Sequence, residues 1–131
     1  RKGATRALPP GSKELPAIYR ETGQPVIIGG SMETGSYLLA GTAGSEETFY
    51  STAHGSGRTM SRTKARHQFR GRDLLERMSA RGIYVQTASY SGLAEEAGAA
   101  YKDIDDITAA TELSGISKRV ARFVPIGNVK G

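Results

Sequence analysis

The sequence contains no cysteine and no long run of apolar residues. Without cysteine, neither a disulfide framework nor a cysteine-based zinc site can form. No apolar stretch approaches the roughly 20 residues that a membrane-spanning helix needs, and residues 1–6 lack the apolar core of a signal peptide. We therefore expect a soluble cytoplasmic protein without a membrane partner.

Acidic residues are missing from one long segment. None occurs between Glu47 and Asp73, although the chain has 13 acidic and 18 basic residues and a net charge of +5. A segment of one sign can neutralise several phosphates, and binding of that type weakens steeply as salt rises. The other interpretation is a solvated basic helix face. The basic residues of this window are Arg58, Arg62, Lys64, Arg66, Arg70 and Arg72.

The length of 131 residues suits one domain with a modest core, so residues 1–131 are treated as one unit. Strands and short helices alternate without a regular βαβ period, which predicts an α+β fold. After a loop-rich start, we expect strands at Pro25–Ile28, Tyr37–Ala40, Phe49–Thr52, Ile83–Thr87 and Val120–Val124. We expect helices at Arg58–His67, Asp73–Arg81 and Leu93–Ala100, and a last one capped by Asp105 with Ile107, Ala110 and Leu113 facing inward.

His54 is the sharpest candidate for chemistry. A lone histidine is usually structural. Here Gly55 and Gly57 leave the imidazole ring unshielded by its neighbours, and the backbone N–H groups of this segment are free to face an anion. A helix starting here would direct Arg58 and Arg62 along one face. A neutral imidazole can attack phosphorus directly, so the segment predicts phosphate handled beside a nucleophile.

Other candidates carry weaker signals. Residues 29–36 form a Gly/Ser loop at a strand end that suits a phosphate or a nucleobase edge, although a glycine-rich hairpin gives the same letters. Asp103, Asp105 and Asp106 suit helix capping better than a metal. His67 is interpreted as a surface or phosphate-contacting residue, and Lys130 follows a strand-like segment near the end of the sequence.

Over its whole length the sequence resembles the RtcB family of RNA ligases, which join an RNA 3′-phosphate or 2′,3′-cyclic phosphate to a 5′-hydroxyl in tRNA splicing and RNA repair. The nucleophile loop His54–Arg62 carries the strongest part of this resemblance. The other matching segments are Arg1–Ala7, Gly30–Met32, Ser36–Tyr37, Gly92–Ala97, Ala100–Asp103 and Gly127–Gly131.

The resemblance implies that His54 attacks GTP, releases pyrophosphate and carries GMP to the RNA 3′-phosphate. It further implies that Arg58, Arg62 and Lys2 bind phosphates of RNA or nucleotide. The partners implied are GTP and an RNA substrate such as tRNA halves or broken RNA, with archease as a candidate helper protein. The positions that match nucleotide contacts are Ser31, Ser36, His54, Gly55, Ser56, Gly57, Tyr101 and Lys130.

The sequence also departs from the family pattern. Alanine is commoner where Ser56 stands, proline where Gly29 stands, and glycine where Glu33 stands. Glu33 adds negative charge to a proposed nucleotide loop, so its side chain is expected to point away or to pair with a basic group.

A larger departure concerns the metal. In the family two manganese ions are held by a cysteine, an aspartate and histidines upstream of the motif that Arg1–Thr5 matches, so no metal ligand is expected in this chain. We therefore expect the C-terminal portion of a longer enzyme, inactive or nearly so alone.

Two alternatives stay open. The chain could be a non-enzymatic RNA-binding module that uses the basic segment from Arg58 to Arg72. It could also be a folding or assembly fragment whose exposed apolar face belongs against missing sequence.

Overall fold

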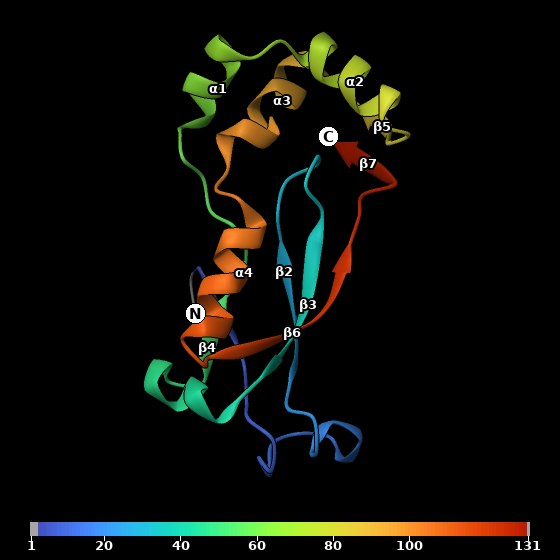
Figure 1. The fold of residues 1–131 in the computed structure, drawn as a ribbon. Helices are drawn as coiled ribbons and strands as arrows, with labels where there is room; N and C mark the ends of the chain where they lie inside the picture. Colours follow the sequence, from blue (N-terminus) through green and yellow to red (C-terminus); the bar gives the residue numbers. More distant parts are fainter. Residues whose placement is uncertain (1–2, 131) are drawn as a thin grey trace.

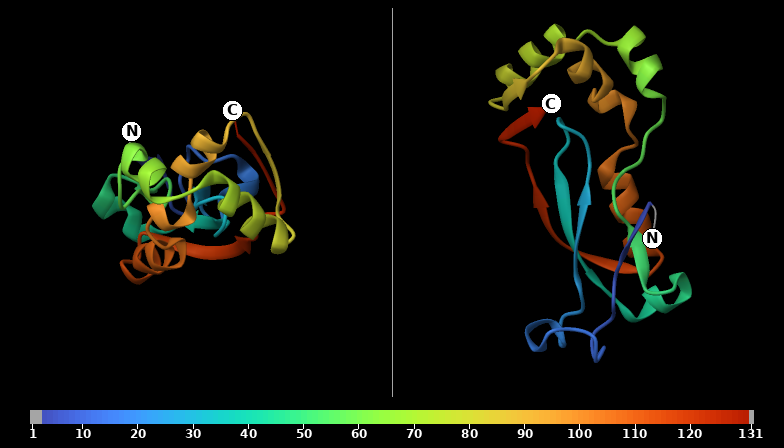
Figure 2. Two further views of the ribbon diagram at one scale, coloured as in Figure 1. Left: turned by 90° about the horizontal axis from the view of Figure 1, so that it is seen from above. Right: turned by 180° about the vertical axis from the view of Figure 1, so that it is seen from behind.

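The computed structural model describes residues 3–130, which form an elongated α+β unit (Figure 1). One half holds a three-stranded antiparallel sheet with one helix, α4 (Ile104–Leu113). Three further helices lie over one end of the sheet, as the view from behind in Figure 2 also shows: α1 (Arg62–Gln68), α2 (Gly71–Ala80) and α3 (Tyr90–Glu95). Three short 3-10 helices, Ala17–Tyr19, Ala43–Thr48 and Gly98–Ala100, lie in the connections. None of the helices in this described range is long and apolar enough to cross a membrane.

The main sheet contains β2 (Pro25–Gly29), β3 (Ser36–Gly41) and β6 (Ser117–Phe123) in the order β2-β3-β6. Burial alternates along β2 and β3, as expected for strands with one covered face. The side chains of the covered face form the first core cluster: Ala7, Val26, Ile28, Tyr37, Leu39 and Ile104. The predicted strands at 25–28 and 37–40 are confirmed.

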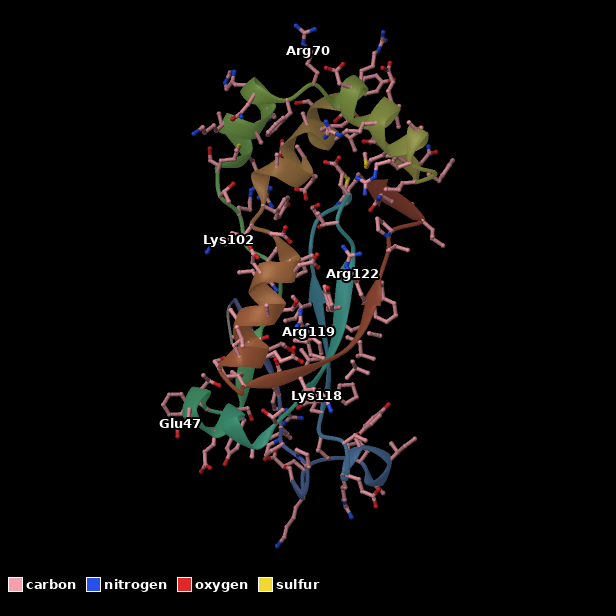
Figure 3. The ribbon with its side chains drawn as sticks, in the orientation of Figure 1. Glu47, Arg70, Lys102, Lys118, Arg119 and Arg122 are labelled. Carbon is pink, nitrogen blue, oxygen red and sulfur yellow. The ribbon has the colours of Figure 1, made fainter. Side chains whose placement is uncertain are left out.

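Helix α4 (Ile104–Leu113) covers this face of the sheet. Ion pairs fasten it, since Arg119 lies 2.7 Å from Glu112 and Arg122 lies 3.3 Å from Asp105. Figure 3 shows both arginines between α4 and the strands. The hydroxyl of Tyr37 also donates to Asp105 at 2.7 Å.

Two expectations about α4 were wrong. The N-cap is Asp103, whose carboxylate accepts from the amide of Asp105 at 2.8 Å, so the helix begins earlier than predicted. The buried side chains are accordingly Ile104 and Thr108, whereas Leu113 is 89% exposed. The predicted stop is confirmed, because Gly115 has a φ of +72°, a conformation that glycine adopts without strain.

The helical end of the molecule contains α1 (Arg62–Gln68), α2 (Gly71–Ala80) and α3 (Tyr90–Glu95). Beside them β5 (Tyr84–Thr87) pairs in parallel with β7 (Gly127–Lys130). A second core cluster fills this end: Met32, Leu74, Met78, Ile83, Leu93 and Ala97. The serine loop, residues 29–36 between β2 and β3, therefore packs against the helices of this end through Met32.

Several expected elements have other boundaries in the structure, and the strand predicted at 120–124 is β6, which begins at Ser117. The strand predicted at 49–52 is β4 (Ser51–Ala53), paired with β1 (Ala4–Arg6), because Phe49 and Tyr50 both have positive φ and form a turn. The predicted helix at 93–100 divides into α3 and the 3-10 helix at 98–100. The helix predicted from Arg58 begins only at Arg62, where Ser61 caps it by accepting from the amide of Lys64 at 3.1 Å.

Candidate functional site

The loop after β2 and the loop after β4 meet through their backbones. Gly29 and Gly55 form an isolated parallel bridge, and the amide of Ser56 donates to the carbonyl of Gly29 at 2.9 Å. A Cβ at Gly55 would lie 3.2 Å from that carbonyl oxygen, so a glycine permits the close approach. The folding of the two strand ends thus places the His54 loop against the serine loop at residues 29–36.

His54 is exposed at this junction. Its carbonyl accepts from the amide of Gly29 at 3.5 Å, while its imidazole makes no hydrogen bond or ion pair with residues 3–130. A neutral imidazole with a free ring nitrogen is a nucleophile. The backbone is therefore anchored while the ring stays available to a ligand.

The serine loop is held in a tight internal arrangement. The hydroxyls of Ser31 and Thr34 share a hydrogen bond of 3.0 Å, and the amide of Gly30 donates to the carbonyl of Gly35 at 2.9 Å. A Cβ at Gly30 would lie 2.5 Å from that same carbonyl oxygen, so only glycine fits there. The loop presents its hydroxyls from a defined main-chain geometry.

A cavity of about 310 Å³ lies beside this loop. Ser31 and Ser36 line it from the loop, Lys130 lines it from β7, and Glu96 lines it from the end of α3. Ligand sites of proteins typically combine a concave shape with a few convergent polar groups. The cavity brings together three sequence-predicted nucleotide contacts that lie up to 99 positions apart in the chain.

Arg58 and Tyr101 do not line this cavity, but both contact Glu96, which does. The Arg58 guanidinium lies 4.7 Å from the centroid of the Tyr101 ring and donates to its hydroxyl at 2.8 Å. The Tyr101 hydroxyl in turn donates to Glu96 at 2.5 Å. Burial, followed by the hydrogen bond and negative charge of Glu96, raises the pKa of Tyr101 above its usual value.

A second, larger cavity of about 690 Å³ adjoins the first and shares Glu96 and Lys130 with it. Arg62 and Arg66 line it from α1, and Glu95 faces them at 3.7 Å and 3.4 Å. An anionic ligand here would compete with Glu95 and Glu96 for these guanidiniums. The site therefore combines guanidiniums that can bind phosphate with carboxylates that pair with the same guanidiniums.

The expectation that Arg58 and Arg62 share one helix face was wrong. Arg58 lies in an extended segment that forms an antiparallel bridge with Tyr101, and Gly57 before it has a φ of +75°, outside the helical region. Both arginines nevertheless reach Glu96, at 3.7 Å and 4.0 Å. They converge through tertiary packing rather than through helical spacing.

The remaining predicted residues have different environments. Gly57 is exposed, whereas Ser56 is only 4% exposed and its hydroxyl has no hydrogen-bond partner among residues 3–130. Lys2 lies outside the described residues. His67 is exposed on α1.

Sequence reasoning assigned no role to Glu95 and Glu96, although both stand in a motif that carried the family resemblance. Their position five and six residues before Tyr101 was the available signal. Glu33 was expected to point away or to pair with a basic group, and it pairs with Arg77 at 2.8 Å. Within residues 3–130, no group of three or more histidine, aspartate or glutamate side chains is arranged to hold a metal ion.

Comparisons with known proteins match this chain along its whole length. Residues 1–131 match the family described as tRNA-splicing ligase RtcB. The chain is 54% identical to the tRNA-splicing ligase RtcB of Pyrococcus abyssi, 53% identical to that of Archaeoglobus fulgidus and 50% identical to the RNA-splicing ligase RtcB of Mycobacterium tuberculosis. All of this chain is covered in each case, but it spans only 14%, 27% and 30% of those proteins.

Proposed function

The chain belongs to the RtcB family, and from that premise we propose that it is the part of a GTP-dependent RNA ligase that carries the guanylate acceptor. In this proposal it is the C-terminal portion of a longer enzyme that joins an RNA 3′-phosphate or 2′,3′-cyclic phosphate to a 5′-hydroxyl. The biological settings proposed are tRNA splicing and RNA repair.

The single observation that supports this function best is the cavity beside the His54 loop. Ser31, Ser36 and Lys130 line it together, and Gly29, another lining residue, bridges to Gly55 next to His54. Two hydroxyls and one ammonium suit the polar edges of a bound nucleotide. A nucleotide held there would have its phosphates near an exposed imidazole.

In the proposed first step, a ring nitrogen of His54 attacks the α-phosphorus of GTP. A P–N bond forms, the bond to the leaving oxygen breaks, and pyrophosphate departs. An oxygen of the RNA 3′-phosphate then attacks the same phosphorus and breaks the P–N bond, which regenerates the imidazole. Attack of the 5′-hydroxyl on the activated 3′-phosphate seals the RNA and releases GMP.

Arg58 and Arg62 take the phosphate-binding role in this scheme. Arg58 lies 3.7 Å from Glu96, and Arg62 lies 3.7 Å from Glu95 and 4.0 Å from Glu96. Ion pairs of that length between partly exposed groups are weak, so a phosphate can replace the carboxylates beside Arg62. Arg58 also donates to the Tyr101 hydroxyl and to the carbonyls of Met60 and Glu95, and a phosphate there would have to replace some of these hydrogen bonds as well. Lys2 is proposed to assist as a further phosphate contact.

Following the family resemblance, we propose that manganese is bound by residues outside this chain. For the same reason the isolated chain is proposed to be inactive or nearly so. Archease is retained only as a candidate helper of the complete enzyme.

Transfer of label from α-³²P-GTP to the complete protein that contains this sequence tests the proposal, in the presence of manganese. We expect an acid-labile, alkali-stable protein adduct that His54→Ala abolishes and that the matched control His67→Ala retains. Label that persists in His54→Ala would refute the assignment of the nucleophile.

A non-enzymatic RNA-binding module remains the second candidate, favoured by the exposed cations Lys64, Arg70 and Arg72 at the helical end. It predicts RNA binding without any GTP-dependent adduct in the complete protein. The labelling experiment therefore separates the two functions.

The outer face of the main sheet bears on the assembly hypothesis. Ile27 is 65% exposed on β2, and Val120 and Phe123 are 59% and 45% exposed on β6. Exposed apolar patches commonly mark contact surfaces. We propose that sequence outside this chain covers this face in the complete enzyme, which is compatible with the ligase function.

A further inference from the structure

Glu33 is a buried carboxylate at the centre of the serine loop, with 8% of its surface exposed. Its Oε1 accepts from Arg77 Nε at 2.8 Å, and its Oε2 accepts from Arg77 Nη2 at 3.1 Å. Paired hydrogen bonds of this kind restrict direction as well as distance. The loop is thereby fastened to helix α2.

The second contact of this carboxylate reaches the segment between Glu96 and Tyr101. The amide of Gly98 donates to Oε2 of Glu33 at 2.8 Å. A Cβ at position 98 would lie 2.7 Å from the same oxygen, so glycine lets the carboxylate approach this backbone without a shift of the Glu33 side chain. Gly98 stands between Glu96 and Tyr101 in the chain, and one carboxylate therefore joins the serine loop to the segment that carries both.

The main chain of Glu33 is also fixed by hydrogen bonds. Its amide donates to the hydroxyl oxygen of Ser31 at 3.2 Å, and its carbonyl accepts from Arg81 Nη2 at 3.0 Å. The neighbouring carbonyl of Met32 accepts from Asn128 on β7 at 3.2 Å. The amide of Glu33 therefore helps, together with the Thr34 hydroxyl, to orient the Ser31 hydroxyl, and Ser31 lines the cavity.

Glu33 also remains ionised at neutral pH. Burial raises the pKa of this carboxyl, but the hydrogen bonds from Arg77 and Gly98 and the charges of Arg77 and Arg81 outweigh it, so the pKa lies below its usual value. The charged form is the one that accepts all of these hydrogen bonds.

We propose that Glu33 is a positioning residue of the nucleotide cavity: it locks the Ser31–Ser36 loop to α2 and to the Gly98 turn, so that nucleotide affinity depends on it. This inference rests on the proposed function of Ser31 and Ser36 as nucleotide contacts. Glu33 acts through these residues, since its own carboxylate is occupied by Arg77 and Gly98.

The test measures GTP binding by calorimetry and GTP-dependent labelling of His54, both in the complete protein. We expect Glu33→Gln to raise the GTP concentration for half-maximal labelling about tenfold and to change the maximal rate by less than about twofold, the pattern of lost binding without lost chemistry. Arg77→Leu should show the same pattern, and the double variant should be no worse than either single variant because one contact is removed in all three.

Controls separate a positioning role from a merely structural one. Glu76 is an exposed carboxylate on α2, next to Arg77, and Glu76→Gln should leave GTP affinity unchanged. Arg77→Lys keeps the positive charge but cannot form the paired hydrogen bonds. If Glu33→Gln does not fold, Arg77→Lys replaces it in the test and should likewise weaken GTP binding. A lower melting temperature with unchanged GTP affinity in these variants would overturn the inference.

Failure of the inference is distinguishable from failure of the ligase function. Unaltered GTP affinity in Glu33→Gln, with His54 labelling intact, refutes only the role of Glu33. Binding of GTP without any labelling refutes the assignment of His54 as the nucleophile. The GTP affinity of Glu33→Gln, measured by calorimetry, still tests the role of Glu33 in that case. An absence of GTP binding in the unsubstituted protein refutes both.

Discussion

Lys130 Nζ lies 3.7 Å from Oε2 of Glu96, the same oxygen that accepts the hydrogen bond of Tyr101. One carboxylate thus neutralises a lysine from β7 and orders a tyrosine from the segment after α3. Glu96 lines both cavities of the site. Replacing its charge should therefore alter the surroundings of Tyr101 and Lys130, two predicted nucleotide contacts, without substituting either residue.

Glu96→Gln is expected to lower the pKa of the Tyr101 phenol. Burial raises that pKa most and would persist, but the hydrogen bond to the carboxylate and its negative charge also raise it and would be lost. Titration of tyrosine Cζ signals by ¹³C NMR measures the change. Glu95→Gln, which removes a neighbouring charge that makes no hydrogen bond to Tyr101, is the matched control. An unchanged Tyr101 pKa in Glu96→Gln would contradict the prediction.

Adjacent glycines in the serine loop should respond very differently to a methyl group. A Cβ at Gly30 would lie 2.5 Å from the carbonyl oxygen of Gly35, whereas at Gly29 no described atom comes within 4 Å. Gly30→Ala should lower the free energy of unfolding by about 1–3 kcal/mol through overpacking, and Gly29→Ala by about 0.5–1 kcal/mol at most in either direction. Chemical denaturation of the complete protein measures both. Equal losses would show that the loop relaxes around the added atom.

The basic segment should contribute to RNA binding through its unpaired cations. Lys64 and Arg70 are exposed and make no ion pair with residues 3–130, while Arg66 lies 3.4 Å from Glu95. Lys64→Ala and Arg70→Ala should each reduce the slope of log affinity against log salt by about one.

Lys118→Ala is the control for this prediction. Figure 3 shows Arg70 at the helical end and Lys118 in the other half of the molecule, on β6. Filter-binding titrations with a single-stranded RNA at several salt concentrations give the slopes. A reduction as large in the control would mean that binding follows net charge rather than this segment.

Much of the local structure follows from short-range patterns. The strands at 25–29 and 36–41 have alternating burial on β-branched or large apolar residues, and α2 ends where Gly82 takes a φ of +75°. Helix α4 shows where such reasoning stops. Asp103 and Asp105 are both good caps by composition, and the hydrogen bond from the Asp105 amide to Asp103 decides between them.

The sequence likewise predicts some features of the candidate site and not others. The histidine followed by Gly55 and Gly57, together with the basic segment, predicts phosphate chemistry from residue types alone. Imidazole nucleophiles and guanidiniums have chemistry that does not depend on the fold. The placement of Arg58 could not be predicted. Its extended backbone depends on the bridge to Tyr101, a residue 43 positions away.

The sequence by itself determined the family, the α+β class, the candidate nucleophile and the excess of positive charge. Those properties reside in residue identity and local order. Only the tertiary structure decided that Ser31, Ser36 and Lys130 line one cavity, that Glu96 joins it to the Arg62 cavity, and that Glu33 reaches Arg77 and Gly98. The physical reason is that these contacts join residues 34 to 99 positions apart, and their geometry is set by how the strands, helices and loops pack rather than by any short-range preference.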